Sequence, residues 1–190
     1  MQPSQPTDSE LVRRVQAGDD AAFDAFMGRY KRPVLNFVYR MLGDEAEAED
    51  VAQEVFVRVY QRLGAFEVRP EQAKISTWLF TLARHAVIDR VRWRKRHPAA
   101  PLDSVAEADI ASDRDAAGDA AAREIGEHIA RALSALPEEQ RTALVLAEYE
   151  ELAYAEIALV MNCSEKSVES RLYRAKQTLR KKLGFLMADG

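Results

Sequence analysis

A change of composition in the middle of the chain limits how the whole can fold. The stretch from Pro98 to Ala120 contains two prolines, many small residues and no aromatic residue, and it holds six acidic residues against one arginine. Such a stretch buries too little apolar surface to offset the entropy lost on ordering. We therefore expect a flexible acidic linker over residues 98–120, between small domains at residues 1–97 and 121–190.

On both sides of this linker, apolar residues recur at the three-to-four spacing of amphipathic helices, and alternating strand-like runs are almost absent. The residues suited to begin or end the first helices are Asp8 or Ser9, Gly18, Asp19, Gly43, Asp44, Gly64 and Ser76. Beyond the linker, the expected helices run from Ala121 to Ala135, Pro137 to Tyr149, Tyr154 to Met161 and Ser164 to Leu183. The predicted fold class is all-α, with two small helical domains.

The overall charge argues against a nucleic-acid partner, but its distribution does not. The net charge is -4 and the pI is about 5.5, whereas phosphate binding uses clustered lysine and arginine. The first cationic cluster consists of Arg84, Arg90, Arg92, Arg94, Lys95 and Arg96. The second consists of Lys166, Arg171, Arg174, Lys176, Arg180, Lys181 and Lys182. Each cluster is either a solvated helix face or a nucleic-acid contact.

Several classes of protein do not fit this sequence. The single Cys163 cannot form an internal disulfide, and one cysteine with three histidines shows no zinc-ligand spacing, so we expect no metal or cofactor. We interpret Cys163 as a small buried residue rather than a redox sensor. A nucleophile with its base and a glycine-rich phosphate loop are both missing, which argues against an enzyme. No stretch approaches the roughly 20 apolar residues of a membrane span, so we expect a cytoplasmic protein without membrane insertion.

The segment from Leu152 to Leu179 has the spacing of a helix-turn-helix, with a short helix, a tight turn and a long basic helix. Ala158 is small where the helices would cross, and Asn162 tolerates the left-handed backbone of the turn. The residues expected to face a DNA groove are Ser164, Lys166, Ser167, Glu169, Ser170, Arg171, Arg174 and Lys176. The alternative is a plain helical hairpin with a basic, solubilising end.

Three segments together resemble a known family. DEAEAEDVAQEVFVRVYQRL is similar to the core-binding helix of the extracytoplasmic-function (ECF) sigma factors of the sigma-70 family, and KISTWLFTLARHAVIDRVRWRKR to their -10 recognition segment. LPEEQRTALVLAEYEELAYAEIALVMNCSEKSVESRLYRAKQTLRKKL is similar to their -35 recognition domain. The resemblance implies an RNA polymerase sigma factor, which directs core polymerase to promoters, with region 2 in residues 1–97 and region 4 in residues 121–190. It also implies three partners: core polymerase (β′ clamp helices and β flap), promoter DNA and an anti-sigma factor.

The resemblance assigns a role to an acidic stripe. Asp50, Gln53, Glu54 and Val57 fall at i, i+3, i+4 and i+7, so they share one face of a helix. Taken alone, such a stripe could be a solvated face without a partner. In the family it docks on the polymerase β′ clamp helices.

The -10 segment must hold single-stranded bases, which bind by stacking on aromatic rings beside a basic track. The candidate residues are Phe66, Trp78, Arg84, His85, Asp89, Arg90, Arg92, Trp93 and Arg94. Helical spacing favours a core position for Trp78, whereas Trp93 lies among arginines. The resemblance further implies that the loop from Ala65 to Lys74 holds a flipped base.

Two positions depart from the family pattern. This chain has His85 after Ala83 and Arg84, where the family usually has asparagine, and Glu169 where a basic residue often precedes Ser-Arg. Because a carboxylate can accept from a cytosine amino group, Glu169 suggests an altered -35 preference. A dimeric helix-turn-helix regulator is the alternative function, but it would leave the acidic stripe and the -10 segment without a role.

Overall fold

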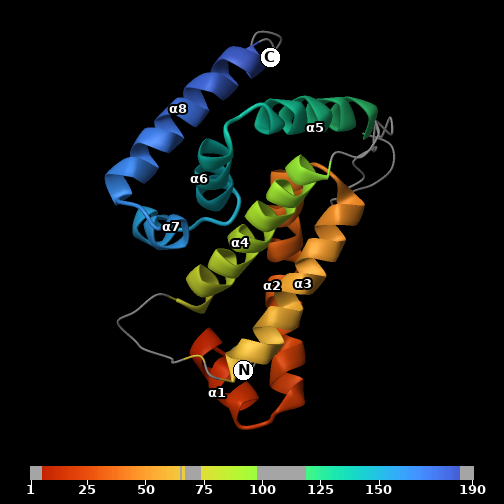
Figure 1. Cartoon of the computed structure of the whole chain (residues 1–190), viewed down its shortest axis with the longest axis vertical. Coiled ribbons are helices and arrows are strands. Elements are labelled where there is room, and N and C mark those ends of the chain that lie inside the picture. Colours follow the sequence, from red (N-terminus) through yellow and green to blue (C-terminus); the bar gives the residue numbers. More distant parts are fainter. Residues whose placement is uncertain (1–5, 65, 67–73, 98–118, 185–190) are drawn as a thin grey trace.

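The computed structural model describes residues 6–64, 66, 74–97 and 119–184. Within these ranges the chain forms eight helices and no strand (Figure 1). They are α1 (Asp8–Gln16), α2 (Asp20–Leu42), α3 (Glu45–Leu63), α4 (Ile75–Arg96), α5 (Asp119–Ser134), α6 (Glu138–Glu148), α7 (Tyr154–Met161) and α8 (Glu165–Leu183). The predicted all-α class is therefore confirmed.

Most of the expected helix boundaries follow from local chemistry. Asp19 accepts a hydrogen bond from the Ala22 amide at the start of α2, and Asp44 accepts one from the Glu47 amide at the start of α3. Gly43 ends α2 with a φ of 74°, in the left-handed region that glycine enters without a steric cost. These side chains satisfy backbone groups that a helix end leaves unpaired.

Two expected caps are wrong. Helix α1 is capped by Thr7 instead of Asp8 or Ser9, because Thr7 and Glu10 form a reciprocal capping box. Ser76 does not cap α4, since this helix begins at Ile75 and its N-cap residue makes no side-chain capping bond.

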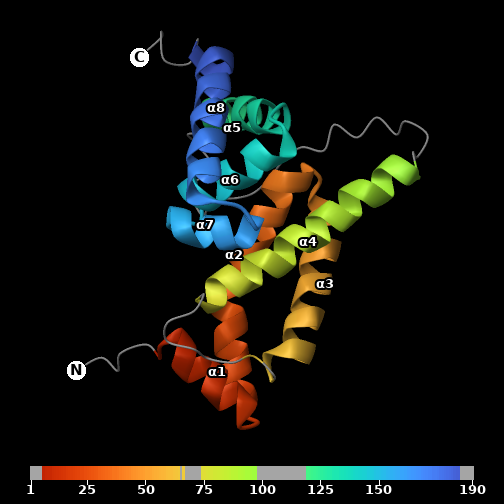
Figure 2. The ribbon, with the colours of Figure 1, turned by 60° about the vertical axis from the view of Figure 1, so that its left-hand side comes forward.

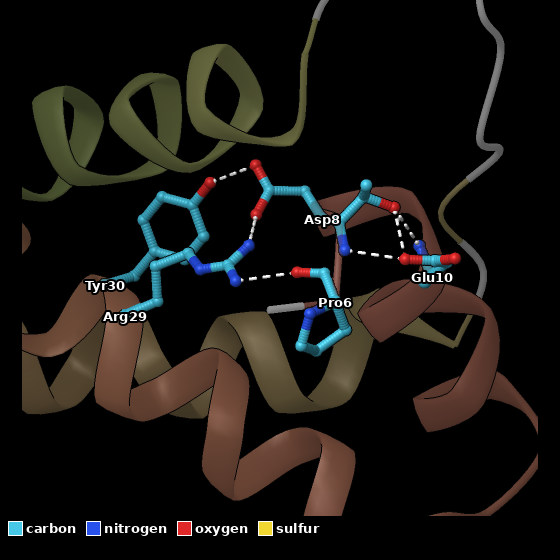
Figure 3. Close-up of polar contacts among 6 residues, drawn as sticks. Pro6, Asp8, Glu10, Arg29 and Tyr30 are labelled. Atoms are coloured by element: carbon cyan, nitrogen blue, oxygen red, sulfur yellow. Dashed lines mark hydrogen bonds and ion pairs between the residues drawn. The ribbon is translucent and has the colours of Figure 1, made fainter. Parts of the chain in front are cut away.

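Asp8 does not cap α1 but connects this helix to α2 through polar contacts (Figure 3). Its carboxylate forms an ion pair with Arg29 and accepts a 2.6 Å hydrogen bond from the Tyr30 hydroxyl. Arg29 also donates to the Pro6 carbonyl at 2.7 Å. Burial and the bond to Asp8 raise the pKa of Tyr30 well above its usual range. The first helix is thereby held against the longer one by partly buried polar contacts.

Helices α2, α3 and α4 pack around an apolar core. Phe37 on α2 and Leu79 on α4 are fully buried, and the rings of Phe37 and Phe80 meet edge to face at 5.6 Å. Val55 on α3 is also fully buried. These contacts leave the other face of α3 and the last turn of α4 at the surface.

The two predicted domains pack against each other. Figures 1 and 2 show α6 and α7 lying against α2 and α4, and the buried apolar residues of both halves form one continuous cluster. Arg141 on α6 donates at 2.7 Å to the carbonyl of Met41, near the end of α2 where carbonyls lack helical partners. Thr142 lies 3.9 Å from the Met41 sulfur. In this conformation the two predicted helical domains are therefore in direct contact. The predicted linker lies outside the described residues up to residue 118.

None of the helices in the described ranges combines the length and apolar character needed to cross a bilayer.

Candidate polymerase and nucleic-acid interfaces

The acidic stripe stands on the outer face of α3. Asp50, Gln53 and Glu54 are exposed, and Val57 is 56% exposed. The helix buries Val51, Val55 and Val59 on its opposite face. The structure therefore brings the four predicted polymerase-binding residues together on one accessible surface.

An apolar groove, which the sequence interpretation missed, lies beside this stripe between α2 and α3. Its volume is about 620 Å³, and its lining residues are Phe23, Met27, Lys31, Leu35, Glu49, Ala52, Gln53, Phe56, Val57, Tyr60 and Gln61. The ring of Phe23 meets that of Tyr60 edge to face at 5.2 Å, and Tyr60 is 67% exposed. The stripe and groove share Gln53 and Val57, so they form one surface that combines polar and apolar contacts. The sequence did contain a signal for this groove, because the aromatic Tyr60 lies three positions after Val57 and so falls on the same side of the helix.

Helix α4 divides its predicted -10 residues between two faces. His85, Asp89, Arg92 and Trp93 are exposed, with Trp93 stacked on His97 at 4.9 Å between ring centroids. These four side chains lie along one outer face, together with the exposed Arg96. This face offers an aromatic platform beside cationic groups, the combination that single-stranded bases bind.

The other three arginines of the -10 set face acidic groups within the protein. Arg84 pairs with Glu139 at 3.0 Å, and Arg90 lies 3.5 Å from Glu54. Arg94 pairs with Glu47 and donates to the carbonyl of Leu42. In this conformation these arginines contribute to packing between helices.

The two aromatic residues near the predicted -10 loop pack together. The rings of Phe66 and Trp78 lie 5.1 Å apart, and both side chains are half-buried. The side-chain amide of Gln16 donates to the carbonyls of Leu63 at 3.1 Å and Phe66 at 2.6 Å. Residues 65 and 67–73, which include most of the expected base-holding loop, lie outside the described residues.

The helix-turn-helix geometry follows the sequence expectation. Asn162 ends α7 with a φ of 49°, and the Ser164 hydroxyl accepts from the Ser167 amide at 3.2 Å to cap α8. Ala158 is 8% exposed at the crossing, and Val168 and Leu172 are buried between the helices. Helix α8 is thus held firmly by its apolar face.

As on α4, some polar side chains of α8 are exposed to solvent and others are paired within the protein. Lys166, Glu169, Ser170 and Arg174 are exposed, and so is Lys176, which pairs with Glu148 at 2.7 Å. This bond raises the pKa of Lys176.

Arg171 has only 26% of its side chain exposed, because it pairs with Glu139 at 2.7 Å and donates to the Cys163 sulfur at 2.8 Å. Tyr173, which the sequence interpretation missed, is 65% exposed and accepts a hydrogen bond from Gln177. The free face of α8 therefore centres on Ser170, Tyr173 and Arg174.

Comparison with known proteins identifies the family. A model of sigma-70 region 2 matches residues 26–97, and a model of sigma-70 region 4 matches residues 127–179. The ECF RNA polymerase sigma factor SigW of Bacillus subtilis is 34% identical, and the match covers 90% of this chain and 94% of the relative. The chain belongs to the ECF sigma factors of the sigma-70 family. The RNA polymerase sigma-H factor of Pseudomonas aeruginosa is another relative of this sigma factor, at 35% identity over 98% of each chain.

Solved structures agree with this assignment. The sigma factor RpoE of Bartonella quintana, crystallised with the anti-sigma factor NepR, has the same fold, with a TM-score of 0.70 and 22% identity over 85% of this chain and 96% of that one. CnrH in complex with the cytosolic domain of CnrY has a TM-score of 0.65 and 25% identity over 95% of this chain and 97% of that one. The resemblance seen in the sequence is thus confirmed in preference to the dimeric-regulator alternative.

Proposed function

We propose that this ECF sigma factor binds core RNA polymerase, directs it to specific promoters and initiates transcription there. It acts as a cytoplasmic initiation factor and performs no catalysis of its own. Residues 1–97 form region 2 and bind polymerase and the -10 element. Residues 98–120 link them to region 4, residues 121–190, which reads the -35 element.

The observation that carries this proposal is the coexistence of two accessible surfaces of different chemistry. The stripe and groove on α2 and α3 combine carboxylates with exposed Val57 and Tyr60, a composition suited to a protein partner. The outer face of α8 presents Lys166, Ser170 and Arg174 at the free side of a helix-turn-helix, where such motifs meet the major groove. A protein surface and a DNA surface on one chain fit a factor that brings polymerase to DNA.

The partners follow from this division. The stripe of Asp50, Gln53, Glu54 and Val57 is proposed to bind the β′ clamp helices, and region 4 to contact the β flap. The sigma factor RpoE of Bartonella quintana was crystallised with the anti-sigma factor NepR, which supports an anti-sigma partner for this chain.

The test uses purified protein, bacterial core polymerase and a library of random promoter fragments from which transcribed members are selected. Asp50→Arg should lower initiation on the order of tenfold or more, because it reverses a charge at the docking surface. Asp24→Arg is the matched control, since Asp24 is exposed on α2 and does not line the groove. Equal initiation by wild type and Asp50→Arg would contradict this docking surface.

The DNA surface is tested in the same selection with Arg174→Ala. We choose Arg174 because Arg171 is tied to Glu139 in the structure. Loss of one base or phosphate contact should weaken dependence on the upstream element by about tenfold, a cost of 1–3 kcal/mol. Arg32→Ala, which removes an exposed arginine from α2, should leave this dependence unchanged. If neither the wild-type protein nor any of these variants supports initiation, the proposed function is wrong.

A further inference from the structure

The C-terminal end of α4 carries an exposed aromatic pair. Trp93 is 50% exposed, and its ring stacks on that of His97 with 4.9 Å between the centroids and 22° between the planes. Figure 2 shows this end of α4 extending beyond the helices packed against it. Trp93 was expected at the -10 interface, whereas His97 was not among the residues selected from the sequence. The pair itself became visible only in the structure.

His97 holds the indole in one orientation. Its backbone amide donates to the Trp93 carbonyl at 2.9 Å, and its Nδ1 lies 3.1 Å from the same oxygen. Because the imidazole lies nearly parallel to the indole, it covers one face of Trp93, and the exposed part of the side chain includes the opposite face. A ring fixed in this way loses little conformational entropy when a ligand stacks on it.

The side chains around this pair are cationic. Arg92, Lys95 and Arg96 are exposed, and none of them forms an ion pair with a carboxylate in the part of the chain that the structure describes. The single carboxylate in the sequence of α4 is Asp89, about one turn before Trp93. An open aromatic face among unpaired cations favours a ligand that combines flat rings with negative charge, as a nucleic-acid strand does.

The exposed aromatic surface on α3 differs in charge. Tyr60 lines the groove together with Glu49, and the adjacent stripe contains Asp50 and Glu54. Carboxylates beside an aromatic ring repel a phosphate backbone, so that surface suits a protein partner. The surroundings of Trp93 have the opposite charge, and we therefore assign this site to nucleic acid.

Helix α4 carries its two tryptophans far apart. Trp78 is half-buried against Phe66 near the start of the helix, and Trp93 lies 15 positions later. At ~1.5 Å per residue, the two side chains are separated by about 22 Å along the helix. This length corresponds to roughly six or seven nucleotides at about 3.4 Å each. An unpaired strand laid along α4 is therefore long enough to reach both ends.

We propose that Trp93 and His97 form a second base-stacking site, in which an unpaired base of the opened promoter stacks on the free face of Trp93 while Arg92 and Arg96 bind the flanking phosphates. His97 is a positioning residue, because it acts through Trp93. This inference rests on the proposed sigma-factor function and adds a contact distant from the Phe66–Trp78 end. Since stacking tolerates every base, the site fixes the position of the opened strand rather than its sequence.

The first test uses fluorescence of the full-length chain. The sequence contains two tryptophans, so Trp78→Phe leaves Trp93 as the single one and keeps an aromatic ring against Phe66. A mixed-sequence single strand of about 12 nucleotides should quench this fluorescence at low salt, and the corresponding duplex should quench it at least about fivefold more weakly. Trp93→Phe, which retains only Trp78, should respond less to the single strand. Circular dichroism checks that both variants stay helical.

The second test locates the stacked base in the polymerase complex. The probe is a promoter recovered from the library, prepared with its -10 region already unpaired and with one abasic site placed at each position in turn. An abasic site at the stacked position should weaken binding of wild type about five- to tenfold and should not weaken binding of Trp93→Ala, because the two changes remove the same contact. Tyr154→Ala is the matched control, since it removes a 42% exposed aromatic ring from α7, and it should show the wild-type pattern.

His97 is tested by the same abasic scan. His97→Ala should reduce the loss at the stacked position about threefold, because the indole is no longer held in place. His97→Phe keeps a ring that can stack on Trp93 and should restore the wild-type loss. Equal patterns for wild type and His97→Ala would contradict the positioning role.

The outcomes distinguish this inference from the proposed function. If the single strand does not quench Trp93 and no abasic position distinguishes wild type from Trp93→Ala, the stacking site is refuted, and the sigma function stands as long as wild type initiates. If Trp93→Ala instead weakens binding to core polymerase without DNA, the surface binds protein and the inference is wrong. The fluorescence titration requires no polymerase, so it tests stacking even if initiation fails.

Discussion

Replacing Glu150 with glutamine should stabilise the protein near pH 8 and leave it unchanged near pH 5. Glu150 is the second residue after α6 and follows Tyr149, on whose ring Arg40 stacks. Burial raises the pKa of Glu150 to about 7 from its usual 4.5, and the nearby charge of Arg40 offsets only part of this effect.

The sign follows from proton binding. Because folded Glu150 holds its proton more tightly than the unfolded chain does, its stabilising effect is complete below about pH 4.5 and is lost as the pH rises through about 7. At about 1.36 kcal/mol for each pH unit, the full interval from 4.5 to about 7 corresponds to at most about 3.4 kcal/mol. Partial contact with solvent lowers the expected loss to about 1–2 kcal/mol. Glutamine never ionises, so the variant avoids this loss.

Urea unfolding followed by circular dichroism at about pH 5 and about pH 8 measures the effect. Glu151→Gln is the control, because it removes the same charge from an exposed neighbour. The expected result is a gain for Glu150→Gln only at the higher pH. If Glu150→Gln changed the free energy of unfolding equally at both pH values, Glu150 would not be a buried carboxyl with a raised pKa.

Two other substitutions test local features by the same measurement. Asn162→Ala should lower the free energy of unfolding by about 1 kcal/mol, because alanine resists the left-handed backbone at this turn, whereas Asn162→Gly should cost nothing. Equal stability of the two variants would contradict that explanation. Tyr30→Phe should cost about 1–2 kcal/mol, since it removes the hydroxyl bonded to Asp8. An unchanged unfolding midpoint would show that this bond adds nothing to stability.

Local sequence patterns, such as apolar periodicity and capping residues, were sufficient to predict where the helices lie and where the turn of the helix-turn-helix falls. Asp19, Asp44 and Ser164 cap helices because each lies just before an apolar periodic segment and carries a short acceptor. Thr7 was missed although its signal was present, since Glu10 three residues later completes a capping box.

The packing of the two halves could not be predicted from local patterns. The bond between Arg141 and Met41 joins residues 100 positions apart, and the Arg84–Glu139 pair spans 55 positions. No periodicity in either segment specifies such a pairing. The inward position of Arg171 was predictable, because it lies three residues after Val168 and four before Ala175, both fully buried.

The pairing of charges explains how an acidic chain can present cationic surfaces. With a net charge of -4, the chain holds more carboxylates than cations. Several of those carboxylates bind the inward arginines of α4 and α8, as Glu47 does with Arg94 and Glu139 with Arg171. The outward cations, such as Arg92 and Arg174, remain exposed. Since phosphate binding depends on the local density of accessible cations, net charge alone was a poor guide to the partner.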